Sequence, residues 1–240
     1  MENLNNNKMK NILLIGGSYG IGFAIAKEMQ DENNIFIACR TNENISELKV
    51  TYIPFDASTD TLDISKLPEV IDGLVYCPGS INLRPFKGIK PESIEADLQV
   101  NFINMVKIIQ TVLPNLTASN QSSIILFSSI AASMGLPFHT SVAASKGAIE
   151  GFAKALAAEY APKIRVNVIA PSLTDTPLAE KFLNNDVKRE KSAERHPLKR
   201  FGTSEDMAQM ASFLLSEKSS WISGQIFHVD GGMSTLLVNG

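Results

Sequence analysis

The sequence predicts an α/β domain in which helices cover both faces of one doubly wound, parallel, seven-stranded sheet. Short β-rich runs alternate along the chain with longer segments of helical spacing. Most of these runs carry apolar residues on both faces, which is typical of strands that are buried on both sides of a sheet. This alternation favours a parallel sheet with crossover helices packed against it. The expected strands are 11–15, 35–39, 51–55, 74–77, 123–128, 165–170 and 225–229.

The helices are expected between these strands. Apolar residues recur at helical spacing in four segments, and Thr203 lies three residues before Asp206 in an approximate capping box. The segments after the second and third strands are short, and each allows only about two turns or a loop. The four expected helices are 23–30, 92–113, 143–160 and 203–215, and the two short segments are 42–49 and 59–66.

The composition favours one domain over residues 11–240. The chain of 240 residues is 44% hydrophobic and 20% charged, and no repeat or linker divides it. A net charge of −3 argues against a nucleic-acid partner, and the charged run 188–191 is interpreted as a solvated helix face. Residues 1–10 are interpreted as a loose tail, since they lack the apolar stretch of a signal peptide or a membrane span. We therefore expect a cytoplasmic protein without a membrane partner.

The cysteines and histidines predict neither a disulfide nor a metal site. Cys39 and Cys77 lie in apolar runs and are expected to be buried free thiols, which suits a reducing compartment. His196 precedes a proline and His228 lies in the last expected strand, and neither has metal-ligand spacing.

A glycine-rich turn joins the first strand to the first helix. It contains Gly16, Ser18, Tyr19, Gly20, Ile21 and Gly22. Glycines at a strand-to-helix turn let a pyrophosphate approach the backbone N–H groups at the helix N-terminus. A glycine cluster alone is also compatible with an ordinary tight turn, but its position favours dinucleotide binding.

The spacing of Gly16, Gly20 and Gly22 resembles the GxxxGxG pattern of the short-chain dehydrogenase/reductase family. Further ordered motifs extend this resemblance over about residues 11–233. It implies that Asn101, Ser129 and Lys146 are active-site residues, and that Thr176 contacts the cofactor. It also implies a nicotinamide dinucleotide cofactor and a homotetramer or homodimer built on the helices 92–113 and 143–160. The other residues expected at the cofactor are Asp56, Ala57, Gly79, Pro171 and Thr174.

The end of the second strand favours NADP(H) over NAD(H). An acidic residue at this position binds the adenosine ribose in NAD-binding folds, whereas an arginine accommodates a 2′-phosphate. Cys39 occupies the position of the acid, and Arg40 follows it. The alternative is that Arg40 is a solvated loop residue.

One position departs from the family. Its enzymes use a tyrosine four residues before the lysine as the proton donor, but this chain has Val142 there. His139 lies seven residues before Lys146, a spacing similar to that of the tyrosine in enoyl-thioester reductases, and imidazole can donate a proton near neutral pH. His139 is therefore a candidate acid; otherwise it lines the site or anchors a loop. Tyr76 is interpreted as a structural ring under the fourth strand.

Three functions remain open from the sequence. The first is an NADP(H)-dependent oxidoreductase for a small carbonyl, alcohol or enoyl substrate, in which the segment 174–201 covers the substrate. This segment is charged and irregular, with Pro177 and Pro197 as interruptions. The second is a dinucleotide-binding sensor or assembly partner, which explains Val142 directly. The third is non-redox chemistry with a retained cofactor.

Overall fold

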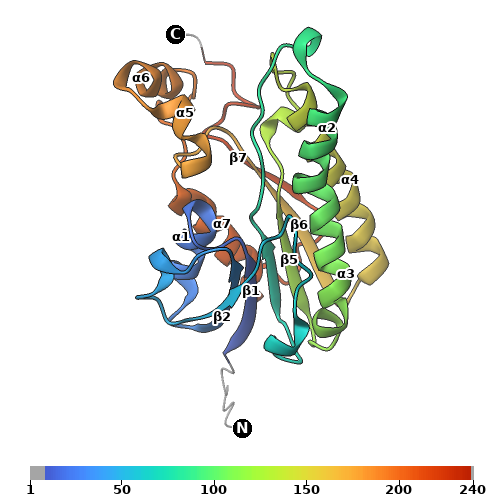
Figure 1. The fold of residues 1–240 in the computed structure, drawn as a ribbon. Coiled ribbons are helices and arrows are strands. Elements are labelled where there is room, and N and C mark those ends of the chain that lie inside the picture. The colour runs from blue at the N-terminus through green and yellow to red at the C-terminus, as the bar shows by residue number, and fades with distance from the viewer. Residues whose placement is uncertain (1–8, 239–240) are drawn as a thin grey trace.

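A computed structural model describes residues 9–238 and contains one parallel, seven-stranded sheet (Figure 1). Its strand order is β3-β2-β1-β4-β5-β6-β7, which confirms the predicted fold class. The chain reverses direction across the sheet between β1 and β4, and ligands of such folds bind beside this switch point. The strands are β1 (Lys10–Ile15), β2 (Asn33–Cys39), β3 (Val50–Pro54), β4 (Gly73–Tyr76), β5 (Ser122–Phe127), β6 (Ile164–Pro171) and β7 (Ile226–Val229).

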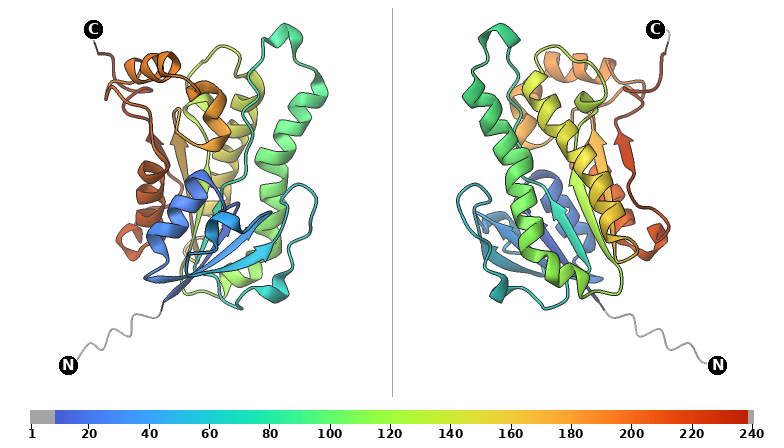
Figure 2. Two further views of the ribbon diagram at one scale, coloured as in Figure 1. Left: turned by 60° about the vertical axis from the view of Figure 1, so that its left-hand side comes forward. Right: turned by 90° about the vertical axis from the view of Figure 1, so that its right-hand side faces the viewer.

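Helices cover both faces of the sheet. Helices α1 (Gly20–Met29) and α7 (Ser204–Leu215) pack together on one face. Helices α3 (Asn104–Thr117) and α4 (Thr140–Tyr160) lie side by side on the other, preceded by α2 (Pro91–Leu98) (Figure 2). The short helices α5 (Glu180–Leu183) and α6 (Asp186–Glu194) lie beyond the carboxyl ends of the strands (Figure 1).

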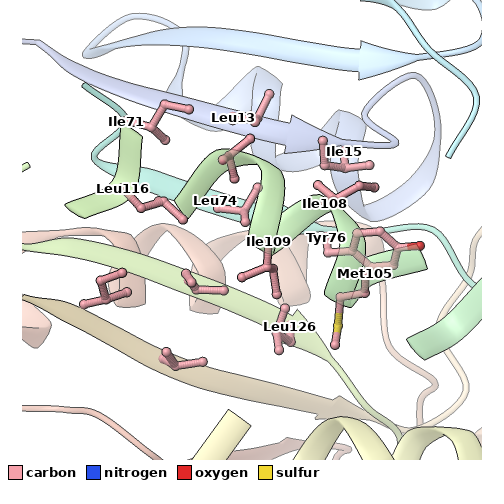
Figure 3. Packing of buried hydrophobic residues seen from close by; sticks show 14 of the residues in the cluster. Leu13, Ile15, Ile71, Leu74, Tyr76, Met105, Ile108, Ile109, Leu116 and Leu126 are labelled. Atoms are coloured by element: carbon pink, nitrogen blue, oxygen red, sulfur yellow. The ribbon is translucent and has the colours of Figure 1, made fainter. Parts of the chain in front are cut away.

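The core consists of two apolar layers, one on each face of the sheet. Along β1, Leu13 and Ile15 belong to the layer under α3 and α4, whereas Ile12 and Leu14 belong to the layer under α1 and α7. Figure 3 shows the first layer, in which side chains of β1, β4 and β5 meet those of α3. Burying each such side chain contributes about 1.5–3 kcal/mol. These layers hold the strand ends, and hence the loops that follow them, in fixed positions.

Several element boundaries differ from the predictions. Helix α1 begins at Gly20 instead of residue 23, inside the glycine turn, and α4 begins at Thr140 instead of 143. The expected helix 92–113 is α2 and α3 joined by a π-helical turn (Gln99–Ile103), and it continues through Pro114 to Thr117. The segments 42–49 and 59–66 contain only single 3₁₀ turns, Glu43–Ile45 and Ile64–Lys66.

The structure also describes the start of the first strand and the start of the last α-helix. Residues 1–8 of the expected tail lie outside the described residues, but Lys10 belongs to β1 and forms an ion pair with Glu217. The sheet therefore begins at Lys10, inside the segment expected as a tail, because Lys10 pairs with Asn33 of β2. The capping box of α7 is confirmed: Thr203 Oγ1 accepts from Asp206 N at 3.2 Å, and the Asp206 carboxylate accepts from Thr203 N.

No helix among residues 9–238 is long and apolar enough to span a membrane.

Candidate functional site

The glycine turn is built for close backbone approach. Gly16 and Gly20 have φ angles of +77° and +54°, a region that favours glycine. A Cβ atom on Gly22 would lie 2.4 Å from the Gly16 carbonyl oxygen, so any side chain there would disrupt the turn. Tyr19, the N-cap of α1, makes no side-chain cap hydrogen bond. The first N–H groups of α1 are therefore available to an anion.

Residues at the end of β2 lie beside this turn. The Cys39 thiol donates to Thr41 O at 3.2 Å, and Asn44 Nδ2 donates to Ser18 O at 3.2 Å, which ties the two segments together. Burial raises the pKa of Cys39, so its thiol is neutral at neutral pH. Arg40 is exposed, and no ion pair is recorded for it in the part of the chain described. A phosphate group could bind at the end of β2 without repulsion, because position 39 has a neutral thiol instead of a carboxylate.

Asp56 and Ala57 follow the end of β3 and are half-buried. The Asp56 carboxylate accepts from Ser58 N at 2.8 Å, and Asp56 N donates to Asp60 Oδ2 at 2.7 Å. These bonds order the turn after β3, which is next to β2 in the sheet. The arrangement fits the expected role of this turn at the adenine end of a dinucleotide.

A cavity of about 890 Å³ opens where β4, β5 and β6 end. We call it the central cavity. It brings together residues that lie far apart in the sequence, and it includes eight of the residues singled out from the sequence for catalysis or cofactor binding. A Cβ atom on Gly20 would lie 3.4 Å from Thr176 Cβ, so the glycine turn directly adjoins one wall. These eight residues are Ile21, Gly79, Ser129, His139, Lys146, Pro171, Thr174 and Thr176.

Lys146 places a buried ammonium group in this cavity. Its Nζ donates to Phe127 O at 3.0 Å, at the end of β5. Burial lowers the pKa of Lys146 to about 8, an effect that Cys77 and Asp97 oppose. Burial also raises the pKa of Cys77 to about 12, so this thiol stays neutral at neutral pH. Lys146 therefore supplies a positive hydrogen-bond donor at neutral pH and loses its charge in mildly alkaline solution.

Asn101 lies behind the central cavity, in the π-helical turn. It is fully buried; its Oδ1 accepts from Ser80 N at 3.1 Å, and its Nδ2 donates to Asp97 O at 2.9 Å. A Cβ atom on Gly79 would lie 3.1 Å from Asn101 Oδ1 and 3.5 Å from Lys146 Nζ. Asn101 thus fixes the loop after β4 against the helix, and the absence of a side chain at Gly79 keeps this corner open.

Asp97 was not identified from the sequence. Its buried carboxylate accepts from Ser80 Oγ at 2.5 Å, from Asn82 Nδ2 at 2.7 Å and from Ser141 Oγ at 2.5 Å. The network therefore joins α2, the loop after β4 and the first turn of α4. The only sequence signal was an acidic residue four positions before Asn101 on the predicted helix.

Val142 and Lys146 both line the central cavity, one helical turn apart on α4. Val142 is buried and offers no hydrogen-bonding group to a substrate. Ser129 follows β5; its Oγ accepts from Ala131 N at 3.2 Å, which leaves its hydroxyl hydrogen for another partner. The site therefore has a donor at Ser129 and a cation at Lys146, but an apolar surface at position 142.

His139 is the N-cap of α4 and also lines the cavity. Its Nδ1 lies 2.7 Å from Pro137 O. A carbonyl can only accept, so Nδ1 carries the hydrogen, and the neutral ring has no hydrogen on Nε2. Only the imidazolium form can therefore donate a proton from Nε2 to a group in the cavity.

His196 also lines the central cavity. It is buried, with Nδ1 2.7 Å from Ser192 O and Nε2 2.9 Å from Ser172 Oγ. From the sequence, His196 was considered only as a metal ligand and set aside for its spacing, although it lies in the segment 174–201 that was expected to cover the substrate. The run 188–191 is likewise more than a solvated face, since Lys188 and Lys191 are exposed but line the cavity. Neither position was predicted as cavity lining, because both lie far in sequence from the glycine turn and the Ser129 and Lys146 motifs.

The remaining predictions concern side chains around the site. Tyr76 is a structural ring as predicted, with its buried hydroxyl donating to Val100 O at 2.8 Å. Cys39 and Cys77 are free thiols as expected. Cys39 is buried, whereas Cys77 is only half-buried and lines the cavity. His228 Nε2 lies 3.3 Å from Ser133 Oγ. Within residues 9–238 no group of three or more metal-ligating side chains is found.

Comparisons with known proteins give a consistent result. A family model described as enoyl-(acyl carrier protein) reductase matches residues 16–234. A tropinone reductase homolog of Arabidopsis thaliana is 32% identical over 97% of this chain and 93% of its own length. A 3-oxoacyl-(acyl-carrier-protein) reductase of Thermotoga maritima is 31% identical over 92% and 96%. The ligand-free aldohexose dehydrogenase of Thermoplasma acidophilum is 26% identical, covers 98% of both chains and superposes with a TM-score of 0.86.

Proposed function

The chain belongs to the short-chain dehydrogenase/reductase family and is an oxidoreductase of that type, and we propose that it uses NADP(H) on a small carbonyl, alcohol or enoyl substrate. The observation that carries the proposal is the central cavity, which adjoins the glycine turn and contains Ser129 and Lys146. The family's tyrosine is absent, so the proposed active site is atypical at Val142.

The residues fit a dinucleotide along the carboxyl edge of the sheet. When bound, the cofactor supplies or accepts a hydride at its nicotinamide ring. The N–H groups at the start of α1 bind the pyrophosphate, and Thr176 lies beside them. Lys146, with its buried ammonium, binds the nicotinamide ribose and raises the positive potential of the cavity.

Arg40 supports the choice of NADP(H). Its exposed guanidinium can form charge-assisted hydrogen bonds with a 2′-phosphate, and Cys39 brings no negative charge to repel that phosphate. A preference for NAD(H) in binding would refute this part of the proposal.

Ser129 and His139 together take the two roles of the family's tyrosine, which are to hydrogen-bond the substrate oxygen and to donate the proton. Ser129 donates its free hydroxyl hydrogen to the substrate oxygen and thereby orients the reacting carbon. His139, in its imidazolium form, gives the proton from Nε2. Asn101 does not touch the substrate; it positions the loop that contains Gly79.

A second candidate function rests on Val142 itself. An apolar side chain at this position suits a protein that binds the dinucleotide without efficient turnover, as a sensor or assembly partner. The two functions are separated by incubating the protein with NADPH and a panel of carbonyl and enoyl compounds. NADPH oxidation with at least one compound supports the oxidoreductase, and tight NADPH binding without oxidation supports the binding protein.

We further propose a homotetramer or homodimer. The helices α3 and α4 lie side by side on one face of the molecule (Figure 2), and α4 is rich in alanine, which allows close packing against a second copy. A monomer in light scattering would refute this assembly.

A further inference from the structure

Helix α6 separates its charges onto two sides. Lys188, Lys191 and Arg195 occur at i, i+3 and i+7, which places them on one face. Asp186, Glu190 and Glu194 recur every four residues and fall on the opposite side of the helix. We call Lys188, Lys191 and Arg195 the cationic rim.

The cationic rim faces the central cavity. All three residues line it, whereas none of its lining residues is acidic. The three side chains belong to exposed residues, so they lie at the mouth rather than deep inside. Ser192 of α6 and His196, two residues after its end, line the cavity beside them, and His196 is buried.

Lys191 and Arg195 form no ion pair or side-chain hydrogen bond within the described residues, whereas Lys188 has two hydrogen-bond acceptors. Lys188 Nζ donates to Lys181 O and to Asn184 Oδ1, both at 2.9 Å. For Lys191 and Arg195, no ion pair and no side-chain hydrogen bond is recorded within residues 9–238, whereas the nearby Arg189 is paired with Asp175 at 2.7 Å. Lys191 and Arg195 are therefore available to an anion that enters the cavity.

The rest of the cavity wall is different. Leu136, Val142 and Phe182 contribute apolar surface, and Ser129 and Lys146 are the polar groups where the proposed chemistry occurs. A ligand that uses both ends needs an apolar body between a reducible or oxidisable group and an anionic group.

We propose that the substrate carries a carboxylate or phosphate group that binds Lys191 and Arg195 at the mouth of the cavity, while its reacting carbon lies at Ser129 and Lys146. This inference rests on the proposed oxidoreductase function. The phosphates of the cofactor have their own binding groups at the start of α1 and at Arg40. The cationic rim therefore selects the substrate.

The test compares straight-chain methyl ketones that end in a carboxylate, a phosphate monoester or a methyl group. The double variant Lys191→Gln/Arg195→Gln is measured beside wild type, and Lys154→Gln, an exposed lysine of α4 that does not line the cavity, is the matched control. Charge-assisted pairs imply a loss of about tenfold or more in kcat/KM for the anionic ketone in the double variant. The neutral ketone should change little, and the better of the two anions identifies the group.

The affinity for NADPH is measured on the same three proteins. We expect it to be unchanged. An equal loss for anionic and neutral ketones overturns the proposal, and so does a matching loss of NADPH affinity, which would assign the cations to the cofactor.

A binding measurement separates this inference from the proposed function. If no ketone is turned over, calorimetry with the protein–NADPH complex still reports whether the anionic ketone binds. In that case the absence of turnover refutes the proposed function, while binding that depends on Lys191 and Arg195 still supports the anion site. No difference in binding between the double variant and wild type refutes the anion site.

Discussion

Val142 and Lys146 lie one turn apart on α4 and line the same cavity, so the buried ammonium shares this cavity with an apolar side chain where the family resemblance implies a tyrosine hydroxyl. Lys146 Nζ is instead held by Phe127 O. The positive charge is thus retained, while the proton donor at position 142 is lost.

Restoring the hydroxyl should increase carbonyl reduction. Val142→Tyr places a phenol one turn before Lys146, at the edge of a cavity large enough to hold the ring. A positioned general acid contributes about 10²–10⁴-fold in rate, so we expect a rise of at least about tenfold in kcat. Steady-state kinetics with NADPH and a small ketone measure it. Val142→Phe is the matched control, because it adds the ring without the hydroxyl, and an equal rise in this control would contradict the explanation.

The histidine makes a prediction about the proton donor. Because Nδ1 of His139 donates to Pro137 O, only the imidazolium form can give a proton from Nε2. His139→Gln keeps a polar side chain but removes this proton, so we expect a loss of about 10²-fold in kcat for carbonyl reduction. Steady-state kinetics with NADPH and a small ketone measure it, and an unchanged kcat in His139→Gln would show that the residue only lines the cavity.

The cofactor preference depends on one guanidinium. Arg40→Gln removes the charge that faces the expected 2′-phosphate and leaves the neutral Cys39 beside it. Loss of a charge-assisted contact should weaken NADPH binding by about tenfold or more, with little change for NADH. Fluorescence titration of both nucleotides measures the ratio, and equal weakening for the two would assign Arg40 a structural role.

The buried lysine costs stability. Lys146 has a pKa of about 8 in the folded protein, below that of a solvated lysine, so the folded state binds fewer protons between pH 8 and about 10.4. The cost of the buried charge is complete below pH 8 and is relieved as pH rises through this window. Lys146→Met should therefore raise the unfolding free energy at pH 7 by about 1 kcal/mol, given about 1.4 kcal/mol per pKa unit and the lost bond to Phe127 O.

Urea denaturation at pH 7 and pH 10 tests this prediction. The gain in Lys146→Met should shrink at the higher pH, and the variant should lose at least about 10²-fold in activity if the ammonium stabilises charge in the site. Lys154→Met is the control, since Lys154 is exposed on the same helix. A variant less stable than wild type at pH 7 would contradict the assigned cost.

The sheet was predictable because its signals are local. Each strand contains a short, mostly apolar stretch, and the glycine turn after β1 marks the edge where ligands of such folds bind. Residues at or just after strand ends, such as Pro171 and Ser129, take their positions from this topology. That is why Ser129, Lys146 and Thr176 were expected at one site before their contacts were known.

The rest of the site depends on contacts between distant segments. His196 enters the cavity because the turn after α6 places it against Ser172, which directly follows β6. Asp97 acquires its three partners only when the loop after β4 and the start of α4 meet α2. The cationic rim has the composition of an ordinary solvated helix, and only its position over the cavity gives it a possible role. None of these contacts leaves a periodic signal in the sequence.

Hydride transfer tests the central claim most directly. The wild-type protein is incubated with NADPH deuterated at the nicotinamide C4 and with a small ketone or enoyl compound that it accepts, and the product is analysed by mass spectrometry. The proposed function predicts one deuterium at the reduced carbon, together with stoichiometric loss of NADPH. NADPH that binds tightly but is not consumed with any compound of the panel would contradict it and would assign the chain to dinucleotide binding alone.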